Sequence, residues 1–430
     1  MTYKKLALMI VCLLALLLHG CQISPSKTAD SKETVGELEI KMLDMSYQPA
    51  VLDVPRTGHY VLKVTNPSAV LHDIELANGV RMEIKPGQSA TKLIDVPEQG
   101  LTYRCSMPGH EQAGMKGIIS VNGKNPVQLH TQIHTAPLNI KPRYFDPKAP
   151  PLRQGKVHYI ELVALERDMA VATNAIQNLW TFNNQVPGPV IRVKVGDTLR
   201  VHLVNPSSNK LAHSVDFHAS QVAWNDEMAS INPGESKIYE WRADYAGVWM
   251  YHCGSNPALH HIASGMYGMV IVEPEGGLPS VDHEFAIVQS EFYLGEQGGA
   301  TDLTKAASSH ASPDYVVFNG VAMQYKDTPI PVQTGKKVRI FVMNAGPNED
   351  SAFHVVGTIF NRVIKEGVEL IPDNKGHWGS QAVDLAPSQG AIVEFTTAED
   401  GLYPMVTHAF NYVGKGALGL FKAGDGNPRN

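Results

Sequence analysis

Val201-His-Leu-Val-Asn205 is a short alternating run that ends in Asn, and it begins the stretch of sequence that decides the fold. After it come a histidine, a Pro-Gly turn, a glycine and a cysteine, namely His213, Pro233-Gly234, Gly247 and Cys253. Alternating runs separated by Pro, Gly and Asn predict strands joined by turns, with successive side chains on opposite faces of a sheet. This stretch therefore predicts part of a β-sandwich.

The same order of signals occurs twice more in the chain. The earlier copy consists of Val61-Leu-Lys-Val-Thr-Asn66, His72, Pro86-Gly87, Gly100 and Cys105. The later copy consists of Ile340-Phe-Val-Met-Asn344, His354, Pro387-Ser388, Gly401 and His408. Three copies predict an all-β chain of three Greek-key β-sandwich domains in tandem.

Length and composition agree with several β domains. The 430 residues exceed what one hydrophobic core usually organises, and 37 Gly with 28 Pro are typical of a turn-rich globular protein. We expect an N-terminal domain at residues 37–122 and core domains at residues 156–275 and 281–424. Residues 123–155 between them are rich in Pro and His and are expected to be a linker.

The N-terminus has the order of an export signal, with Lys4 and Lys5 followed by an apolar run over residues 6–18. Thirteen apolar residues are fewer than the roughly 20 that a membrane-spanning helix needs. Leu18-His-Gly-Cys21 resembles the bacterial lipoprotein signal, which favours lipidation of Cys21 over an ordinary cleaved signal. We expect a signal at residues 1–20, a flexible tether at residues 21–36, and an exported, periplasmic protein anchored to a membrane by lipid.

The net charge limits the expected binding partners, and the positions of the cysteines limit the expected disulfides. The net charge is −6, and loss of Lys4 and Lys5 with the signal makes it more negative, so nucleic acid is not an expected partner. Of the four cysteines, one lies in the signal and one is the lipidation candidate. The remaining two, Cys105 and Cys253, are far apart in the chain, so a disulfide between them is not the favoured use.

Two copies carry the ligand set of a blue-copper electron-transfer site, which is one thiolate, two imidazoles and a thioether. The sets are His72, Cys105, His110 and Met115 in the first copy, and His213, Cys253, His261 and Met266 in the second. Both His110–Met115 and His261–Met266 are five residues apart, which favours His261 over His260. The alternative is that each Cys is an inert thiol and each Met a core filler, but the same order occurs in both copies.

The second copy contains additional polar residues. Alternation along a strand places His252 on the face opposite Cys253, and it places Asp216 and His218 together on the face opposite His213. Asp216, His218 and His252 therefore predict a second metal site, joined to the first by the single step from His252 to Cys253.

The third copy has lost the cysteine, because Thr407-His408 stands where His252-Cys253 would. It keeps His354 and His408, and these could complete a three-histidine site with an open position and acid groups nearby. The alternative is that both are relics packed at the end of a sandwich.

Residues 156–423 resemble the copper-containing nitrite reductases. The resemblance rests on His213-Ser-Val-Asp-Phe-His218, Tyr251-His-Cys253, His261-Ile-Ala-Ser-Gly-Met266, Phe353-His-Val-Val-Gly357 and Val406-Thr-His408. It implies cupredoxin-like domains and type 1 copper on His213, Cys253, His261 and Met266. It further implies type 2 copper on His218, His252 and a neighbouring subunit's His408, proton handling by Asp216 and His354, and a substrate pocket shaped by Val356.

The resemblance also implies a dissimilatory-type activity, the one-electron reduction of nitrite to nitric oxide and water, in a homotrimer. Residues 37–122 look like an extra cupredoxin fused in front, so we expect three coppers per chain. A soluble redox donor, such as a c-type cytochrome or a small cupredoxin, would supply electrons. An acidic pH optimum is expected if both proton donors must begin protonated, since an unperturbed His titrates near ~6.5.

Two other functions are compatible with copper ligands. A multicopper oxidase needs several His-x-His pairs, and none of the 18 histidines stands two residues from another. A copper-binding electron-transfer lipoprotein would need only the two type 1 sites, and the sequence cannot show that the type 2 ligands converge.

Overall fold

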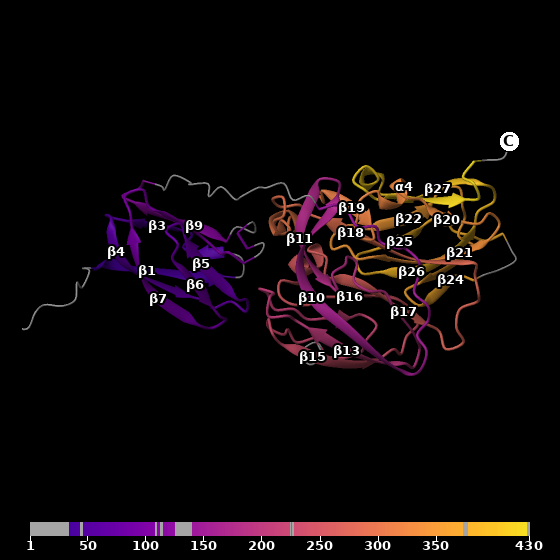
Figure 1. Cartoon of the computed structure of the whole chain (residues 1–430), viewed down its shortest axis with the longest axis horizontal. Helices are drawn as coiled ribbons and strands as arrows, with labels where there is room; N and C mark the ends of the chain where they lie inside the picture. The colour runs from indigo at the N-terminus through magenta and orange to yellow at the C-terminus, as the bar shows by residue number, and fades with distance from the viewer. Residues whose placement is uncertain are drawn as a thin grey trace, which may run out of the picture.

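The structure is a computed structural model that describes residues 34–43, 46–107, 110–111, 115–124, 140–223, 225, 228–372 and 377–427. These residues form six β-sheets, and the longest helix among them, α2 (Ala258–Ala263), has six residues. In Figure 1 the strands of a front domain, drawn in indigo, lie beside a larger body whose colours run from magenta to yellow. The predicted all-β class with several β-sandwich domains is confirmed.

The front domain is the part of the chain that contains strands β1 to β9. It has two sheets, in the orders β2-β1-β4-β7 and β3-β9-β8-β5-β6. Its strands are β1 (Thr34–Leu43), β2 (Ser46–Gln48), β3 (Val51–Val54), β4 (Gly58–Thr65), β5 (His72–Leu76), β6 (Arg81–Ile84), β7 (Ser89–Val96), β8 (Leu101–Arg104) and β9 (Lys116–Val121). Alternation builds its core, since Tyr60, Leu62 and Val64 of β4 are buried while Lys63 between them is exposed.

The first core domain has sheets in the orders β11-β10-β13-β15 and β12-β17-β16-β14. Its strands are β10 (Val157–Ala172), β11 (Ala175–Phe182), β12 (Ile191–Lys194), β13 (Thr198–Val204), β14 (Asp216–Phe217), β15 (Ser236–Arg242), β16 (Gly247–His252) and β17 (Tyr267–Glu273). Helix α2 lies between β16 and β17.

The second core domain has sheets in the orders β19-β18-β21-β26-β23-β24 and β20-β28-β27-β22-β25. Its strands are β18 (His283–Phe292), β19 (Tyr315–Phe318), β20 (Ile330–Val332), β21 (Lys337–Asn344), β22 (Ser351–Val355), β23 (Arg362–Lys365), β24 (Val368–Ile371), β25 (Val383–Leu385), β26 (Gly390–Thr396), β27 (Gly401–Thr407) and β28 (Leu418–Ala423). Its helices are α3 (Leu303–Ala306), α4 (Gln324–Asp327) and the 3-10 helix η1 (Phe410–Tyr412).

The internal repeat of the sequence is also a repeat of topology. The parallel pairs β1–β4, β10–β13 and β18–β21 occupy equivalent places in one sheet of each domain. The parallel pairs β3–β9, β12–β17 and β20–β28 do so in the other sheet. Strands β8, β16 and β27 are therefore equivalent, and the residues that follow them directly are Cys105, Cys253 and His408.

The two core domains pack against each other over an apolar surface and a buried ion network. One cluster of buried residues contains Val248 of β16 and Phe341 of β21. Beside it, Arg192 Nη1 and Arg339 Nη1 each lie 2.7 Å from a carboxylate oxygen of Glu284. Buried charges are tolerated only when they are paired closely, and here the pairing of Arg192 with Glu284 links the first core domain to the second.

Several sequence predictions concern residues outside the described ranges. These are the signal at residues 1–20, residues 21–33 of the tether with the lipidation candidate Cys21, and residues 125–139 of the linker at residues 123–155. Residues 34–36, which were expected in the tether, belong to strand β1 instead. Where the chain is described, no helix has the length and apolar character to cross a bilayer. The domain boundaries stay predictions.

Candidate metal centres

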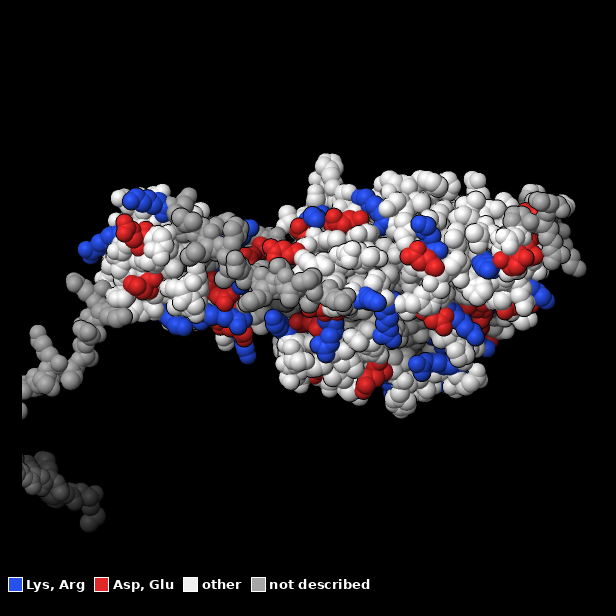
Figure 2. Space-filling view, turned by 45° about the horizontal axis from the view of Figure 1, so that its top comes forward, with Lys and Arg blue, Asp and Glu red and all other residues white. Residues whose placement is uncertain are grey.

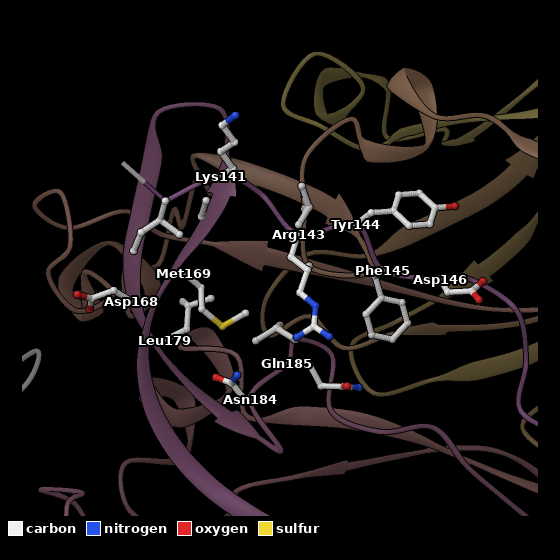
Figure 3. Close-up of a pocket in the computed structure, with 15 residues that line it drawn as sticks. Lys141, Arg143, Tyr144, Phe145, Asp146, Asp168, Met169, Leu179, Asn184 and Gln185 are labelled. Carbon is white, nitrogen blue, oxygen red and sulfur yellow. The ribbon is translucent and has the colours of Figure 1, made fainter. Parts of the chain in front are cut away.

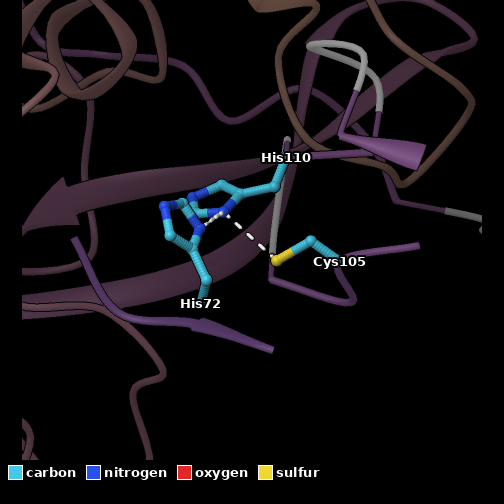
Figure 4. A group of neighbouring side chains, drawn as sticks. All are labelled: His72, Cys105 and His110. Atoms are coloured by element: carbon cyan, nitrogen blue, oxygen red, sulfur yellow. Dashed lines mark hydrogen bonds between the residues drawn. The ribbon is translucent and has the colours of Figure 1, made fainter. Parts of the chain in front are cut away.

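The first candidate centre lies in the front domain, where loops leave the ends of its strands. Figure 4 shows His72, Cys105 and His110 converging. Cys105 Sγ is 3.3 Å from His110 Nδ1, and His72 Nδ1 is 3.1 Å from the same nitrogen. All three side chains are buried, as is Met115, whose carbonyl accepts a hydrogen bond from the Cys105 amide. The structure thus brings the first predicted ligand set together.

A buried carboxylate supports this centre. Asp73 accepts hydrogen bonds from the Ser106 amide at 2.6 Å and from Arg81 Nε at 2.5 Å. Burial opposes ionisation of Asp73, but the Ser106 and Arg81 bonds lower its pKa. Burial raises the pKa of the neighbouring Cys105 thiol to about 12, and the Asp73 charge adds to the increase. A cation bound to the Cys105 thiolate would offset the increase in pKa that burial and the Asp73 charge cause.

The second candidate centre repeats this arrangement in the first core domain. Cys253 Sγ lies 3.2 Å from His261 Nδ1 and 3.9 Å from His213 Nδ1, and Met266 is fully buried beside them. Burial opposes ionisation of Cys253, but hydrogen bonds from His213 and from the Ser214 amide lower its pKa. The site therefore favours a thiolate, which is the form that binds metal.

His260 and His261 are both buried on α2, but only one of them faces the thiol. Both rings pack on Trp180, with centroid distances of 4.5 Å for His260 and 4.7 Å for His261, but only a ring nitrogen of His261 contacts Cys253. Burial lowers the pKa of each histidine to about 3, so both rings are neutral. The geometry agrees with the choice of His261 that was made from spacing.

The structure adds one residue to this centre that the sequence analysis did not identify. Glu166 of β10 places Oε1 3.5 Å from Nε2 of His213 and accepts hydrogen bonds from the amides of Lys210 and Leu211. A carboxylate on the far nitrogen of a metal-binding histidine orients the ring and makes it a stronger ligand. No sequence signal linked Glu166 to His213, because Glu166 lies in β10 and His213 lies in the loop between β13 and β14, far along the chain.

The third candidate centre lies on the outer face of the same domain. Asp216 of β14 and His252 of β16 are cross-strand partners. His218 Nε2 is 3.1 Å from His252 Nε2, and Asp216 Oδ2 is 3.7 Å from that same nitrogen. Burial lowers the pKa of His218, and the neighbouring His252 lowers it further, which keeps an electron pair available for a metal. Three potential ligand atoms thus meet at a partly exposed surface.

The predicted residues of the third copy form a separate pair. The rings of His354 and His408 lie 5.5 Å apart, and His354 Nδ1 contacts the carbonyl of Gln381. Within the described parts of this single chain, His408 is not among the residues clustered at Asp216, His218 and His252. The ring of Phe410, which is 59% exposed, lies 5.2 Å from the His408 ring, and Val356, two residues after His354, is 39% exposed.

One cavity in the described part of the chain contains none of the predicted ligands. Its volume is about 510 Å³, and residues 140–146 form one wall. Figure 3 shows Arg143, Met169 and Gln185 projecting toward the same space. Since no thiol, imidazole or clustered carboxylate lines it, the cavity does not compete with the three centres as a metal site.

Known proteins that are similar to this chain are copper enzymes. Over 278 residues, the chain is 39% identical to the copper-containing nitrite reductase of Neisseria meningitidis serogroup B, covering 63% of this chain and 70% of the relative. The chain belongs to the copper-containing nitrite reductases. The enzyme of this name from Rhizobium sullae is 30% identical over 277 residues, which cover 59% of this chain and 72% of that protein.

Solved structures of the nitrite reductase family give the same assignment. The copper nitrite reductase of Nitrosomonas europaea is 34% identical with a TM-score of 0.57, covering 63% of this chain and 95% of that structure. The Thermus scotoductus enzyme is 30% identical with a TM-score of 0.56 and covers 64% of each chain. A multicopper oxidase family model matches residues 165–277. The protein is thus a copper enzyme, and its Cys, His and Met donor sets suit that metal.

Proposed function

We propose that this protein reduces nitrite to nitric oxide and water at the centre formed by Asp216, His218 and His252. The reaction consumes one electron and two protons for each nitrite and releases one water. The observation that carries the proposal is the position of this centre directly behind Cys253. Because His252 and Cys253 are consecutive, one peptide link connects an electron-transfer ligand set to an exposed anion-accessible site.

Each ligand set has a distinct role. Copper would supply one-electron transfer at the two Cys/His/Met sets, and binding of an anion at the histidine set. The type 1 ligands are His213, Cys253, His261 and Met266 in the core, and His72, Cys105, His110 and Met115 in the front domain. Together with a type 2 site this gives three coppers per chain, with electrons relayed from type 1 to type 2.

Asp216 is placed to handle the first proton. Its carboxylate is 24% exposed and lies 3.7 Å from His252, so it borders the open side of the histidine pair. A carboxyl group in that place can donate a hydrogen bond to a bound oxyanion and protonate the oxygen that leaves as water. His354, held by the Gln381 carbonyl through Nδ1, has its Nε2 available to supply or relay the second proton.

The type 2 site requires a second copy of the chain. Two imidazoles leave the set one ligand short of three, and His408 of the partner subunit would complete it. The surface at His408 is suited to such contact, because the exposed Phe410 packs against His408 with the ring centroids 5.2 Å apart, and Val356 is exposed two residues after His354. The partner subunit's Val356 would then shape the nitrite pocket. A site shared head to tail between copies forms a ring when the rotation between copies closes. The resemblance to the nitrite reductases implies that this ring is a homotrimer.

The cellular location and the electron donor of the enzyme are proposed from the sequence. A lipid on Cys21 would anchor the enzyme to a membrane on the periplasmic side, with residues 21–36 as the tether. The expected donor is a c-type cytochrome or a small cupredoxin.

A multicopper oxidase is the second candidate, favoured by the family model at residues 165–277. That activity needs a trinuclear cluster built from His-x-His pairs, which the 430-residue sequence lacks. Oxygen uptake in the absence of nitrite would support this candidate.

The experiment that tests the proposal measures copper per chain and anaerobic nitric oxide release with a chemical reductant. Three coppers with nitric oxide release are expected. Two coppers without nitric oxide would identify an electron-transfer lipoprotein instead.

A further inference from the structure

A cavity of about 340 Å³ lies at the boundary between the front domain and the first core domain. Both domains line it: its walls are Arg104–Met107 and Glu111 from the front domain, and Glu166, Asn178, Ser208, Lys210 and Gly298–Ala300 from the core. Figure 2 shows acidic and basic side chains interspersed along this boundary. The front domain therefore faces the core through one shared, polar space.

Each wall of this cavity reaches a copper-ligand set. On the front side, the ligand Cys105 itself lines the cavity. On the core side, Glu166 lines it and contacts the ligand His213 at 3.5 Å. The two Cys/His/Met sets are thus separated by a single cavity and the side chains of its two walls.

The boundary has the character of an electron-transfer contact. A cavity of this volume has room for several waters, at roughly 30 Å³ each, and its charged lining offers them partners. Electron-transfer interfaces are small and hydrated, and they are individually weak. Weak contact is sufficient here, because linking two domains in one chain raises their effective concentration.

We propose that the front domain is the built-in electron donor of its own core, docked through the Cys105 segment onto the rim of Glu166, Ser208 and Lys210. The inference rests on the proposed nitrite reductase function and adds the immediate donor to it. One electron leaves the front site and enters the core type 1 site, and no bond forms or breaks. A soluble one-electron donor protein then reduces the front site again, because the docked front domain covers the core rim.

The test follows electron redistribution in the full-length, copper-loaded protein. A pulse of reducing radical, below one equivalent per chain, is delivered anaerobically without nitrite. Absorbance then reports the front and core sites, whose separate spectra come from the Cys253→Ser and Cys105→Ser variants. In the wild type we expect a first-order transfer whose rate does not depend on protein concentration.

A bulky side chain in the cavity should separate the two domains. Ser208 is exposed and lines the cavity, whereas the adjacent Ser207 is exposed but does not line it. Ser208→Trp should slow the transfer at least tenfold, and Ser207→Trp should leave it unchanged. Lys210→Glu should also slow it, because the substitution places another acid beside Glu111 and Glu166, with the exposed Lys326→Glu as its control.

Three outcomes decide the inference. Equal transfer rates in Ser208→Trp and Ser207→Trp would overturn it, as would a rate that rises in proportion to protein concentration. Nitrite turnover with a small chemical reductant that reaches the core directly should persist in Ser208→Trp. If turnover is absent even in the wild type, the proposed function fails, which is a different result from a failure of docking.

Discussion

Asp216 and His252 face each other as cross-strand partners, with Asp216 Oδ2 3.7 Å from His252 Nε2. The Asp216 carboxylate is close enough to contact an oxyanion bound beside His252. It is not one of the three histidine ligands of the proposed type 2 site, so its removal should leave the metal bound. Asp216→Asn should therefore lower kcat for nitrite by about 100-fold or more, the usual loss when a positioned acid is removed. Copper content and the blue absorbance should stay unchanged, since Asn is isosteric with Asp.

The matched control for this prediction is Asp327→Asn on α4, an exposed acid away from the three centres. Nitrite turnover and copper content are measured on both variants. Wild-type turnover in Asp216→Asn would show that another group delivers the proton.

Sharing of the type 2 site between copies can be tested by complementation. His252→Ala removes a ligand from one side of the proposed site, and His408→Ala removes one from the other, so each variant alone should lack type 2 copper and turnover. Mixed trimers would pair the intact His252 of one subunit with His408 of the partner subunit. For random assembly this restores about a quarter of the wild-type sites.

The variants are unfolded together, refolded with copper, and assayed beside each variant treated alone. Mixtures that stay as inactive as the separate variants, while assembling as wild-type oligomers, would place both ligands in the same subunit.

Much of the site was predictable because its residues sit at strand ends. Cys105, Cys253 and His408 follow equivalent strands, so a repeat visible in the sequence also aligned them in space. Strand alternation placed His252 opposite Cys253, and the pairing of Asp216 with His252 follows from the same two-residue period.

The supporting residues could not be predicted from spacing in the same way. Glu166 of β10 reaches His213 only because the fold brings the loop between β13 and β14 against that strand. Docking of the front domain depends on a surface that no local motif encodes. The supporting role of Asp73 could be predicted only in part from the sequence. It directly follows the ligand His72, as Ser214 follows His213, and both accept a hydrogen bond from the amide after the cysteine.

Asp73 should contribute to the stability of the front domain. Asp73→Ala leaves the Ser106 amide and Arg81 without their acceptor, and lost hydrogen bonds of this kind cost about 1 to 3 kcal/mol. The front-domain melting transition, followed through its blue absorbance in the Cys253→Ser background, should move to lower temperature. Asp95→Ala is the control, because the Asp95 side chain is 67% exposed. Equal melting temperatures would show that water replaces the lost acceptor.

Stability of the core should depend on pH through Glu291. Burial raises the pKa of this carboxyl group from 4.5 to about 7, against hydrogen bonds from Tyr293 and from the amides of Asn348 and Glu349, and the Glu349 charge adds to the increase. The folded state therefore holds a proton that the unfolded chain has released. The contribution to the free energy of unfolding is complete below pH 4.5 and is lost as pH rises through about 7.

The expected loss between these pH values is about 3 kcal/mol, measured by urea unfolding with tryptophan fluorescence on the copper-loaded protein. Glu291→Gln should remove this pH dependence, because its carbonyl oxygen can accept the Asn348 and Glu349 amides while its amide group donates to the Tyr293 oxygen. Glu399→Gln, an exposed control, should keep the wild-type slope. A wild-type slope in Glu291→Gln would mean that Glu291 is already ionised in the folded core at pH 4.5.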